Sequence, residues 1–546
     1  MSFASPRLVA CALAFLIPTS GCTAQGETGS PHSTDEPLGF VDFSTSCDPA
    51  VRDAVNRGVA LFHHMTYPVA RSTFETVIEH DPDCAMGYWG AAMTLFQPLW
   101  PTRPGAAELQ QGWALMQEAR RRGPGTDREE MFVRATEAFF DPSLDPDYWA
   151  RIERWAAATT ELYVAFPDDL EVRSFFALSQ LATASRFGAA ADHHARAHEV
   201  LATVLREEPT HPGAVHYTIH ANDFAGRQDQ SLDVVRSYGE IAPQNPHALH
   251  MPSHIFVRLG EWDEVVSWNL RAAEAALAQR VGPSNEFVWD EYPHAVEYLA
   301  YAYLQQGRDE EAERVIREIN LTSDLQPSFK TAFHLASTAS RFVLERKDWS
   351  AAAELPVRSP TWVNWDRFTW PEAIAWFTRG LGAAHMDDAG GVAQSLARLE
   401  ELSARATEAG EVPFASEIDV LFLQLMAWNA HRDALPDSAV DLLARAIELD
   451  EATPKHPVTP GAQIPAMEML GELYLELDEP RRALEAFERS DSVTPGRFNT
   501  ILGMARSAAA IGDQARAREH YSRLAELAFY GSSRDGVMEA ERFLAR

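Results

Sequence analysis

The sequence predicts an all-α fold, a solenoid of stacked helix-turn-helix repeats, and two observations support this prediction. First, the stretch from Glu208 to Trp262 matches itself after a shift of 34 residues, a period typical of helical-hairpin repeats. Second, apolar residues recur at helical spacing along the chain, and no stretch alternates polar and apolar residues as a strand would. Because each hairpin buries its apolar face only against its neighbours, we expect an elongated stack.

The two copies within this stretch carry the same pair of histidines, spaced H-x-x-x-H, on the first helix of each hairpin. Residues four apart lie on one face of a helix, so each pair points one way, and stacking brings the pairs side by side. Four imidazoles on one wall form a candidate transition-metal site. The equivalent positions in the first and second copies are Pro212 and Pro246, His216 and His250, His220 and His254, and Gly226 and Gly260.

Composition excludes several classes of function. The chain has 546 residues, of which 46% are hydrophobic and 23% charged, and its formal net charge is −32. Such an acidic surface argues against nucleic acid and against anionic lipid as partners, and it attracts cations. Because the sequence has no Gly-rich phosphate loop, we expect no nucleotide cofactor.

The N-terminus has the features of an export signal. An apolar run from Leu8 to Ile17 is too short to span a bilayer and is typical of a signal peptide. Residues 1–22 are therefore predicted to be a signal peptide, and Cys22 resembles the lipidated cysteine of a bacterial lipoprotein. Thr19 stands where leucine is usual, which leaves ordinary cleavage nearby as the alternative. Residues 23–45 are predicted to be a flexible tether. The membrane is expected as a partner only through the N-terminal lipid anchor at Cys22.

Two cysteines, Cys47 and Cys84, remain in the mature protein. In an oxidising compartment outside the cytoplasm such a pair predicts one disulfide. Two buried free thiols are the alternative, because unpaired cysteine is commonly buried.

After the tether, residues 46–350 are predicted to form an N-terminal solenoid with the histidine-lined groove, and residues 351–546 a C-terminal set of similar repeats. Pro98–Pro104 contains three prolines and interrupts the first set, while Arg280–Tyr292 is an insertion. Ser359–Pro371 interrupts the second set, and its tryptophans are expected to fill space beneath a loop. The expected helices of the first set lie at about 48–64, 68–80, 106–121, 127–140, 147–166, 170–184 and 192–208, and those of the second at 371–386, 390–409, 418–432, 436–450, 464–477, 481–490, 500–511 and 514–527.

These features resemble the tetratricopeptide (TPR) proteins. A turn glycine, a small residue in the second helix and a closing proline recur in register, as in the unit with Gly471, Ala483 and Pro495. The runs D-P-D-C-A-M-G-Y-W-G, H-Y-T-I-H-A-N-D and H-A-L-H-M-P-S-H-I-F are similar to those of an exported bacterial TPR group with a D-P-x-C-A-M-x-x-W-G motif and His-rich repeats. The resemblance implies a right-handed superhelix whose first helices line a groove that commonly holds a peptide or another ligand.

Counting back from the turn glycines, the groove positions are rich in histidine and carboxylate. Neutral imidazole suits copper and zinc, so a Cu or Zn ion is the expected cofactor. The predicted metal ligands are His216, His220, His250, His254 and His294; Asp223, His247, Glu297 and His63 are predicted to support them or to line the groove; and Glu297 and Tyr301 are the candidates for a catalytic role.

Two classes of function follow from this pattern. One is an exported metal-binding protein, periplasmic or anchored as a lipoprotein, with the question of enzymatic activity left open. The other is a non-catalytic scaffold at the cell envelope that grips a peptide or protein partner in its groove, with the histidines pinning neighbouring repeats by hydrogen bonds. Pro252, between His250 and His254, is expected to kink the helix. The kink would either orient the two histidines toward a metal ion or disrupt their geometry.

Overall fold

A computed structural model describes residues 36–546, except 100–102, 145, 185–189, 225 and 454. The predicted signal peptide, the lipidation site Cys22 and most of the predicted tether therefore lie outside the described residues.

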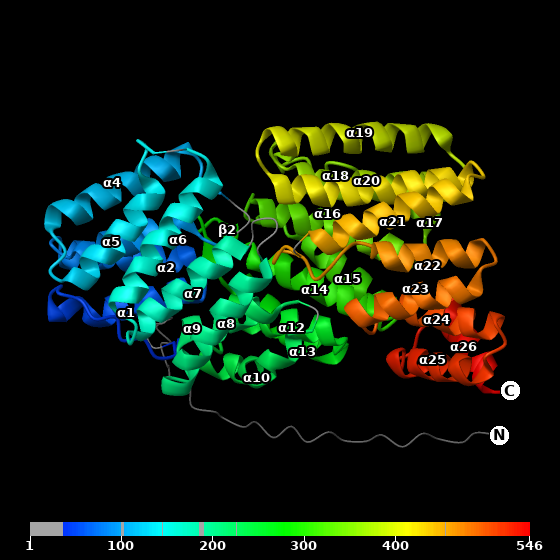
Figure 1. The fold of residues 1–546 in the computed structure, drawn as a ribbon, viewed down its shortest axis with the longest axis horizontal. Helices are drawn as coiled ribbons and strands as arrows, with labels where there is room; N and C mark the ends of the chain where they lie inside the picture. The colour runs from blue at the N-terminus through cyan, green and yellow to red at the C-terminus, as the bar shows by residue number, and fades with distance from the viewer. Residues whose placement is uncertain (1–35, 100–102, 145, 185–189, 225, 454) are drawn as a thin grey trace, which may run out of the picture. The chain divides into compact units, whose positions relative to one another are not determined.

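The regular secondary structure of the described residues is almost entirely helical, as the sequence predicts, and Figure 1 shows the helices in chain order. The first half contains η1 (Pro49–Val51), α1 (Arg52–His63), α2 (Tyr67–His80), α3 (Ala85–Phe96), α4 (Ala106–Arg122), α5 (Asp127–Phe140), α6 (Tyr148–Ala165), α7 (Leu170–Ala184), α8 (Ala190–Glu207), α9 (Pro212–Asn222), η2 (Gln228–Ser231), α10 (Leu232–Ile241), α11 (Pro246–His250), α12 (Pro252–Leu259) and α13 (Trp262–Ala278). The second half contains α14 (Glu291–Gln305), α15 (Asp309–Leu321), α16 (Phe329–Leu344), α17 (Trp349–Ala353), η3 (Trp365–Arg367), α18 (Thr369–His385), α19 (Ala389–Glu408), α20 (Val412–Arg432), α21 (Pro436–Ala452), α22 (Ala466–Glu476), α23 (Pro480–Val493), α24 (Phe498–Ala510), α25 (Gln514–Leu527) and α26 (Asp535–Leu544).

The helices pair in sequence order, and the first helix of one hairpin also packs on the first helix of the next. Thus α18 contacts α19 and α20, and α20 contacts α21 and α22; Figure 1 shows α18, α19 and α20 side by side. This contact pattern is that of a TPR-type α-solenoid, because each hairpin buries its apolar face against its neighbours. In the insertion, β1 (Arg280–Val281) and β2 (Phe287–Val288) form a short antiparallel ribbon, which helical periodicity could not indicate.

One packing device recurs at both ends of the solenoid. The ring of Phe74 on α2 lies so close to Gly58 and Gly90 that a Cβ on Gly90 would come within 2.3 Å of it. At the other end, a Cβ on Gly503, on α24, would lie 2.4 Å from the ring of Phe487 on α23. Gly471 on α22 also lies against the ring of Phe487. In both places a phenylalanine of a second helix packs between glycines of two consecutive first helices, and this packing keeps successive hairpins close together.

The end of the predicted tether is packed rather than flexible. From Pro37 onward the chain lies on the solenoid, and Phe43 is fully buried. The ring of Phe43 stacks on Trp89 with centroids 5.1 Å apart, and the guanidinium of Arg128 lies 4.4 Å from its centroid. The boundary predicted at residue 45 therefore falls too late, because the apolar residues Leu38, Val41 and Phe43 find a buried surface that the sequence alone does not display.

The division predicted at residue 350 does not separate two bodies, since Pro37–Arg546 forms one compact unit. Long-range hydrogen bonds join the two sets of repeats. Trp262 Nε1 donates to the carbonyl oxygen of Gly496 at 2.7 Å, and Arg497 Nη1 donates to the hydroxyl of Tyr301 at 2.6 Å. Among the described residues, no helix is long and apolar enough to cross a membrane.

Cys47 and Cys84 form a disulfide, with their Cα atoms 4.8 Å apart. Cys47 lies just before η1, and Cys84 is the residue before α3. The bond therefore ties the entry segment to the second hairpin and closes a loop of 37 residues.

The double substitution Cys47→Ser and Cys84→Ser should destabilise the protein by roughly 3–4 kcal/mol, because the unfolded chain gains the entropy of the opened loop. Urea unfolding with and without a reductant measures this difference. Unaltered protein should lose the same stability on reduction, whereas the double variant should not respond. Equal stability of both proteins under oxidising conditions would contradict a stabilising bond.

Candidate metal centre

The two histidine repeats begin with the same local signal, which sets the register of their side chains. Pro212 and Pro246 occupy the first turn of α9 and α11, where a missing N–H costs nothing. The residue before each proline caps the helix: His211 Nδ1 accepts the Ala214 N–H, and Asn245 Oδ1 accepts the Ala248 N–H. Both first helices therefore start at equivalent positions and present their H-x-x-x-H pairs alike.

Pro252 splits the second of these helices, as expected. Helix α11 ends at His250 and α12 begins at Pro252, because proline cannot donate the backbone hydrogen bond of a continuous helix. The break does not separate the histidines: the Nε2 atoms of His250 and His254 lie 3.1 Å apart.

The histidines gather into two buried trios, each with its ligand atoms within 4.8 Å of one another. In the first trio, His216 Nε2 lies 3.2 Å from the Nε2 atoms of both His220 and His247. The second trio contains His250, His254 and His294, with the rings of His250 and His294 4.1 Å apart between centroids. All six side chains are at most 7% exposed.

The outer ring nitrogens of the first trio are held by hydrogen-bond acceptors. His216 Nδ1 donates to the carbonyl oxygen of His63 at 2.5 Å, and His247 Nδ1 donates to the carboxylate of Glu291 at 3.2 Å. A neutral imidazole carries one proton, so in its neutral form each ring is protonated on Nδ1 and has a lone pair on Nε2.

The second trio follows the same rule. His250 Nδ1 donates to Asn269 Oδ1 at 2.7 Å, and His254 Nδ1 donates to Asp223 at 2.9 Å. His294 Nδ1 lies 3.0 Å from His334 Nε2, and His334 in turn donates its Nδ1 proton to Glu297 at 2.5 Å. In the neutral form of His334, Nε2 is the acceptor, and His294 then carries its proton on Nδ1.

In each trio two Nε2 lone pairs therefore face one another with no proton between them. His216 and His247 form one such pair, and His250 and His254 the other. A proton is a poor bridge here, because burial holds the pKa of His216 and His250 well below its usual range and lowers that of His254 to about 4. Two facing acceptors repel, and a cation bound by both relieves the repulsion.

Charges around the trios balance. The carboxylates are Asp223, Asp290, Glu291 and Glu297, and the cations paired with them are Lys330, Lys455, Arg258 and Arg341. Burial alone would raise the pKa of Asp223, but Lys455, His254 and Arg258 hold it well below its usual range. Four negative and four positive side chains thus surround the six imidazoles.

The segment from Lys455 to Gln463, between α21 and α22, covers the histidines from the C-terminal half. Lys455 Nζ binds Asp223 at 2.7 Å, Arg341 Nη1 donates to the carbonyl oxygen of Ala462 at 2.9 Å, and Gln463 Nε2 donates to Ser337 at 2.7 Å. Pro457 and Val458 line the space beside the trios. The groove that the sequence predicts is therefore filled at the histidines by the chain itself.

The structure places the predicted supporting residues in different roles. Asp223 holds His254, while His63 contributes its carbonyl oxygen and binds Tyr217 and Glu171 through its ring. His247, predicted only to line the groove, belongs to the first trio. These three residues all lie at the histidine cluster.

The two candidates for catalysis lie further from the trios. Both oxygens of Glu297 are occupied, by His334 on one side and by Ser337 and Arg341 on the other, so it reaches the second trio only through His334. The hydroxyl of Tyr301 binds Arg497. Neither group is brought into contact with the six rings by a hydrogen bond among the described residues.

Several residues of the site carry no clear signal in the sequence. His334 lies on the first helix of the hairpin that follows the one carrying His294. Applying the same count of groove positions to this next hairpin would have predicted it. Glu291, Lys330, Asn269 and Lys455 come from helix ends, a second helix and a loop, where the repeat pattern says nothing.

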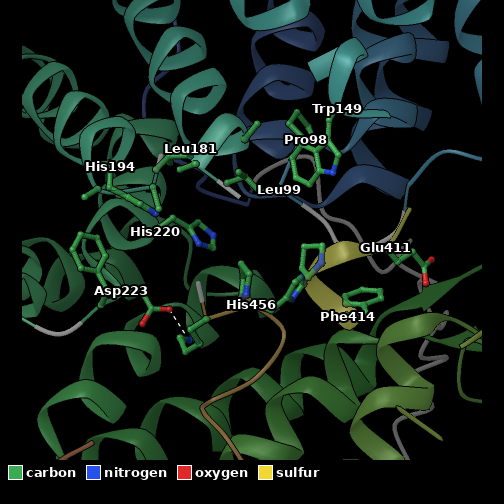
Figure 2. Close-up of a pocket in the computed structure, with 18 of the residues that line it drawn as sticks. Pro98, Leu99, Trp149, Leu181, His194, His220, Asp223, Glu411, Phe414 and His456 are labelled. Atoms are coloured by element: carbon green, nitrogen blue, oxygen red, sulfur yellow. Dashed lines mark ion pairs between the residues drawn. The ribbon is translucent and has the colours of Figure 1, made fainter. Parts of the chain in front are cut away.

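Two cavities adjoin the trios. The smaller, of about 10 Å³, is lined by His220, His247, His254 and His294 together with Lys330, Pro457 and Val458, and it has room for about one water-sized ligand. The larger, of about 390 Å³, shares His220 and Pro457 with it. Figure 2 shows Trp149 and Phe414 across the open space of this larger cavity from His194.

Comparisons with known proteins assign no function to this chain. No family model matches the chain, and no curated protein matches it. Among solved structures, the APC/C hetero-tetramer Cut9–Hcn1 is 13% identical with a TM-score of 0.32, over 91% of this chain and 90% of that chain. The human IFIT1 dimer with m7Gppp-AAAA is 13% identical with a TM-score of 0.38, over 89% and 96%, and yeast Tom70 is 12% identical with a TM-score of 0.33, over 91% and 96%.

At these identities and TM-scores nothing about binding or activity carries over to this chain. The fold class stands on the chain's own helical hairpins: it is a TPR-type solenoid, an architecture that serves widely as an interaction scaffold.

Burial of the trios can be checked by chemical modification. Diethyl pyrocarbonate should modify the exposed His80 rapidly, while His216 and His250 should react at least tenfold more slowly, because they are at most 1% exposed. Peptide mapping by mass spectrometry measures each rate. Rapid modification of His216 and His250 in folded protein would mean that the groove is open there, as a peptide-binding scaffold requires.

Proposed function

We propose that this protein binds two transition-metal ions, copper or zinc, one in each histidine trio. The observation that supports this most strongly is the close approach of paired Nε2 atoms, 3.1–3.2 Å apart, in rings whose Nδ1 atoms are each held by an acceptor. Two nitrogens bound to one tetrahedral Zn²⁺ at about 2.0 Å would lie roughly 3.3 Å apart, close to the observed separation. Neutral imidazole is a preferred ligand of both metals.

The surroundings of the trios suit a metal ion. Acceptors that fix the outer nitrogen of a histidine ligand orient the ring and make it a better donor, and five of the six rings have such a partner. Tyr298, whose ring contacts all three rings of the second trio, has a buried hydroxyl with no hydrogen-bond partner among the described residues. A water bound to an ion would supply one.

Each ion would keep an open coordination position, because each trio offers three protein ligands. Because the charges of the surrounding side chains already balance, they do not compensate the positive charge of the ions. A small anion such as hydroxide would do so, and the small cavity beside Lys330 has room for one. Three ligands with an open position are typical of catalytic or carrier sites rather than structural ones.

Loss of one trio should halve the metal content. Purified protein loaded with Zn²⁺ or Cu²⁺ should hold about two ions per chain, and the double variant His250→Ala and His254→Ala about one, because three ligands are needed per ion. Elemental analysis after gel filtration measures both. The matched control His80→Ala and His431→Ala, which changes two histidines outside the trios, should keep both ions.

A second variant guards against loss of folding. Asn269→Ala retains every ligand and every charge but removes the acceptor that holds His250 Nδ1, so it should lower the affinity of one ion by about 10–100-fold. Competition with a chromogenic chelator reports this change. Unaltered protein that retains no ion after loading would overturn the proposed function and leave a scaffold of helical repeats.

We also propose that the mature protein acts outside the cytoplasm as a lipoprotein or periplasmic protein. The signal-like run before Cys22 and the disulfide between Cys47 and Cys84 support this. Fractionation of cells producing the unaltered protein and the Cys22→Ser variant tests it: an anchored protein should leave the membrane fraction when Cys22 is lost. Unprocessed, cytoplasmic protein would contradict export.

A further inference from the structure

The larger cavity beside the trios, here named the aromatic chamber, has walls suited to a flat apolar ligand. Its aromatic residues are Tyr148, Trp149, Phe224 and Phe414, and aliphatic side chains such as Leu99 fill much of the remaining wall. A volume of about 390 Å³ lies in the range of small-molecule sites. Offset and edge-on contacts with aromatic walls favour an aromatic ligand over an aliphatic one of the same size.

Most of the charged side chains that the structure describes on the chamber wall already have a partner. Asp223 is paired with Lys455, Figure 2 marks this ion pair, and Glu451 is paired with Arg489. Arg103 lies over the ring of Tyr148 at 4.7 Å and donates to the carbonyl oxygen of Gly410. A charged ligand would have to compete with these partners, and its loss of hydration would oppose binding.

Glu411 also disfavours an ionic ligand. Burial raises the pKa of its carboxyl, and nearby Arg103 only partly offsets this. This group is therefore a weak counter-ion for a cationic ligand.

The polar groups at the histidine end of the chamber are neutral imidazoles. Burial lowers the pKa of His456 to about 3. His220 lines both the chamber and the small cavity between the trios. A neutral imidazole accepts or donates one hydrogen bond, which matches a hydroxyl group better than an ion.

We propose that the aromatic chamber binds an uncharged aromatic compound that carries a hydroxyl group, a member of the phenol class, and presents it to the histidine cluster across His220. The role of the chamber as a substrate site rests on the proposed metal function. Binding itself rests only on the walls, and it should occur with or without metal.

Calorimetric titration of the full chain with phenol tests the proposal. We expect about one binding site per chain. Binding of benzoate, benzylamine and cyclohexanol should be at least tenfold weaker, since the first two carry charge and the third has no aromatic face. Equal binding of the charged probes would overturn the argument from paired charges.

Two variants locate the site. Trp149→Ala removes part of the wall, and Ala191→Trp fills the chamber from an exposed position that tolerates a larger side chain. Each should weaken phenol binding at least tenfold. The control Trp362→Ala, which removes an exposed tryptophan from the wall of a different cavity, should bind phenol like the unaltered protein. Unchanged binding in both chamber variants would overturn the proposal.

Metal content measured on the same samples separates this inference from the proposed function. Phenol binding by protein that retains no ion would support the chamber and overturn the metal site. Metal-loaded protein that does not bind phenol would overturn the chamber alone. In protein loaded with Co²⁺, phenol should shift the visible absorption of the ion; saturation without a shift would overturn the role of the chamber as the substrate site.

Discussion

The positions of the ring protons determine what the histidine cluster can do. Acceptors outside the trios take the Nδ1 protons of His216, His247, His250 and His254, so the lone pairs of these rings must point inward at one another. Such an arrangement is costly in a buried site unless a cation occupies it. Three features maintain this orientation of the rings. The helical stack brings the rings together, the carboxylates hold them, and the loop covers them.

The C-terminal repeats complete the site rather than extend a groove. A solenoid with an open concave face is suited to a peptide, but here Lys455 and the residues after it fill that face and neutralise Asp223. Closure lowers the local dielectric, which strengthens every interaction inside. It also leaves the chamber lined by Trp149 and Phe414 as the larger space beside the histidines, so access to them is restricted to small molecules.

Much of the fold could be predicted because repeat proteins are governed by local rules. The period of 34 residues, the capping positions at Pro212 and Pro246 and the turn glycines each act within one hairpin, and the hairpin stacks on its neighbours. Five of the six histidines of the trios were predicted as ligands for the same reason. His247 was predicted only to line the groove, because the repeat pattern does not indicate which of two adjacent groove positions points toward the other hairpin.

By itself, therefore, the sequence determined the class of fold, the pairing of helices and the face on which the histidines lie, since periodicity and capping are local. Only the tertiary structure decided the tautomers of the rings, the covering of the groove by Lys455–Gln463 and the packing of Phe43 under Arg128. These features join residues that lie tens to hundreds of positions apart. Their geometry depends on how many hairpins stack and at what angle, and a local sequence pattern does not determine either quantity.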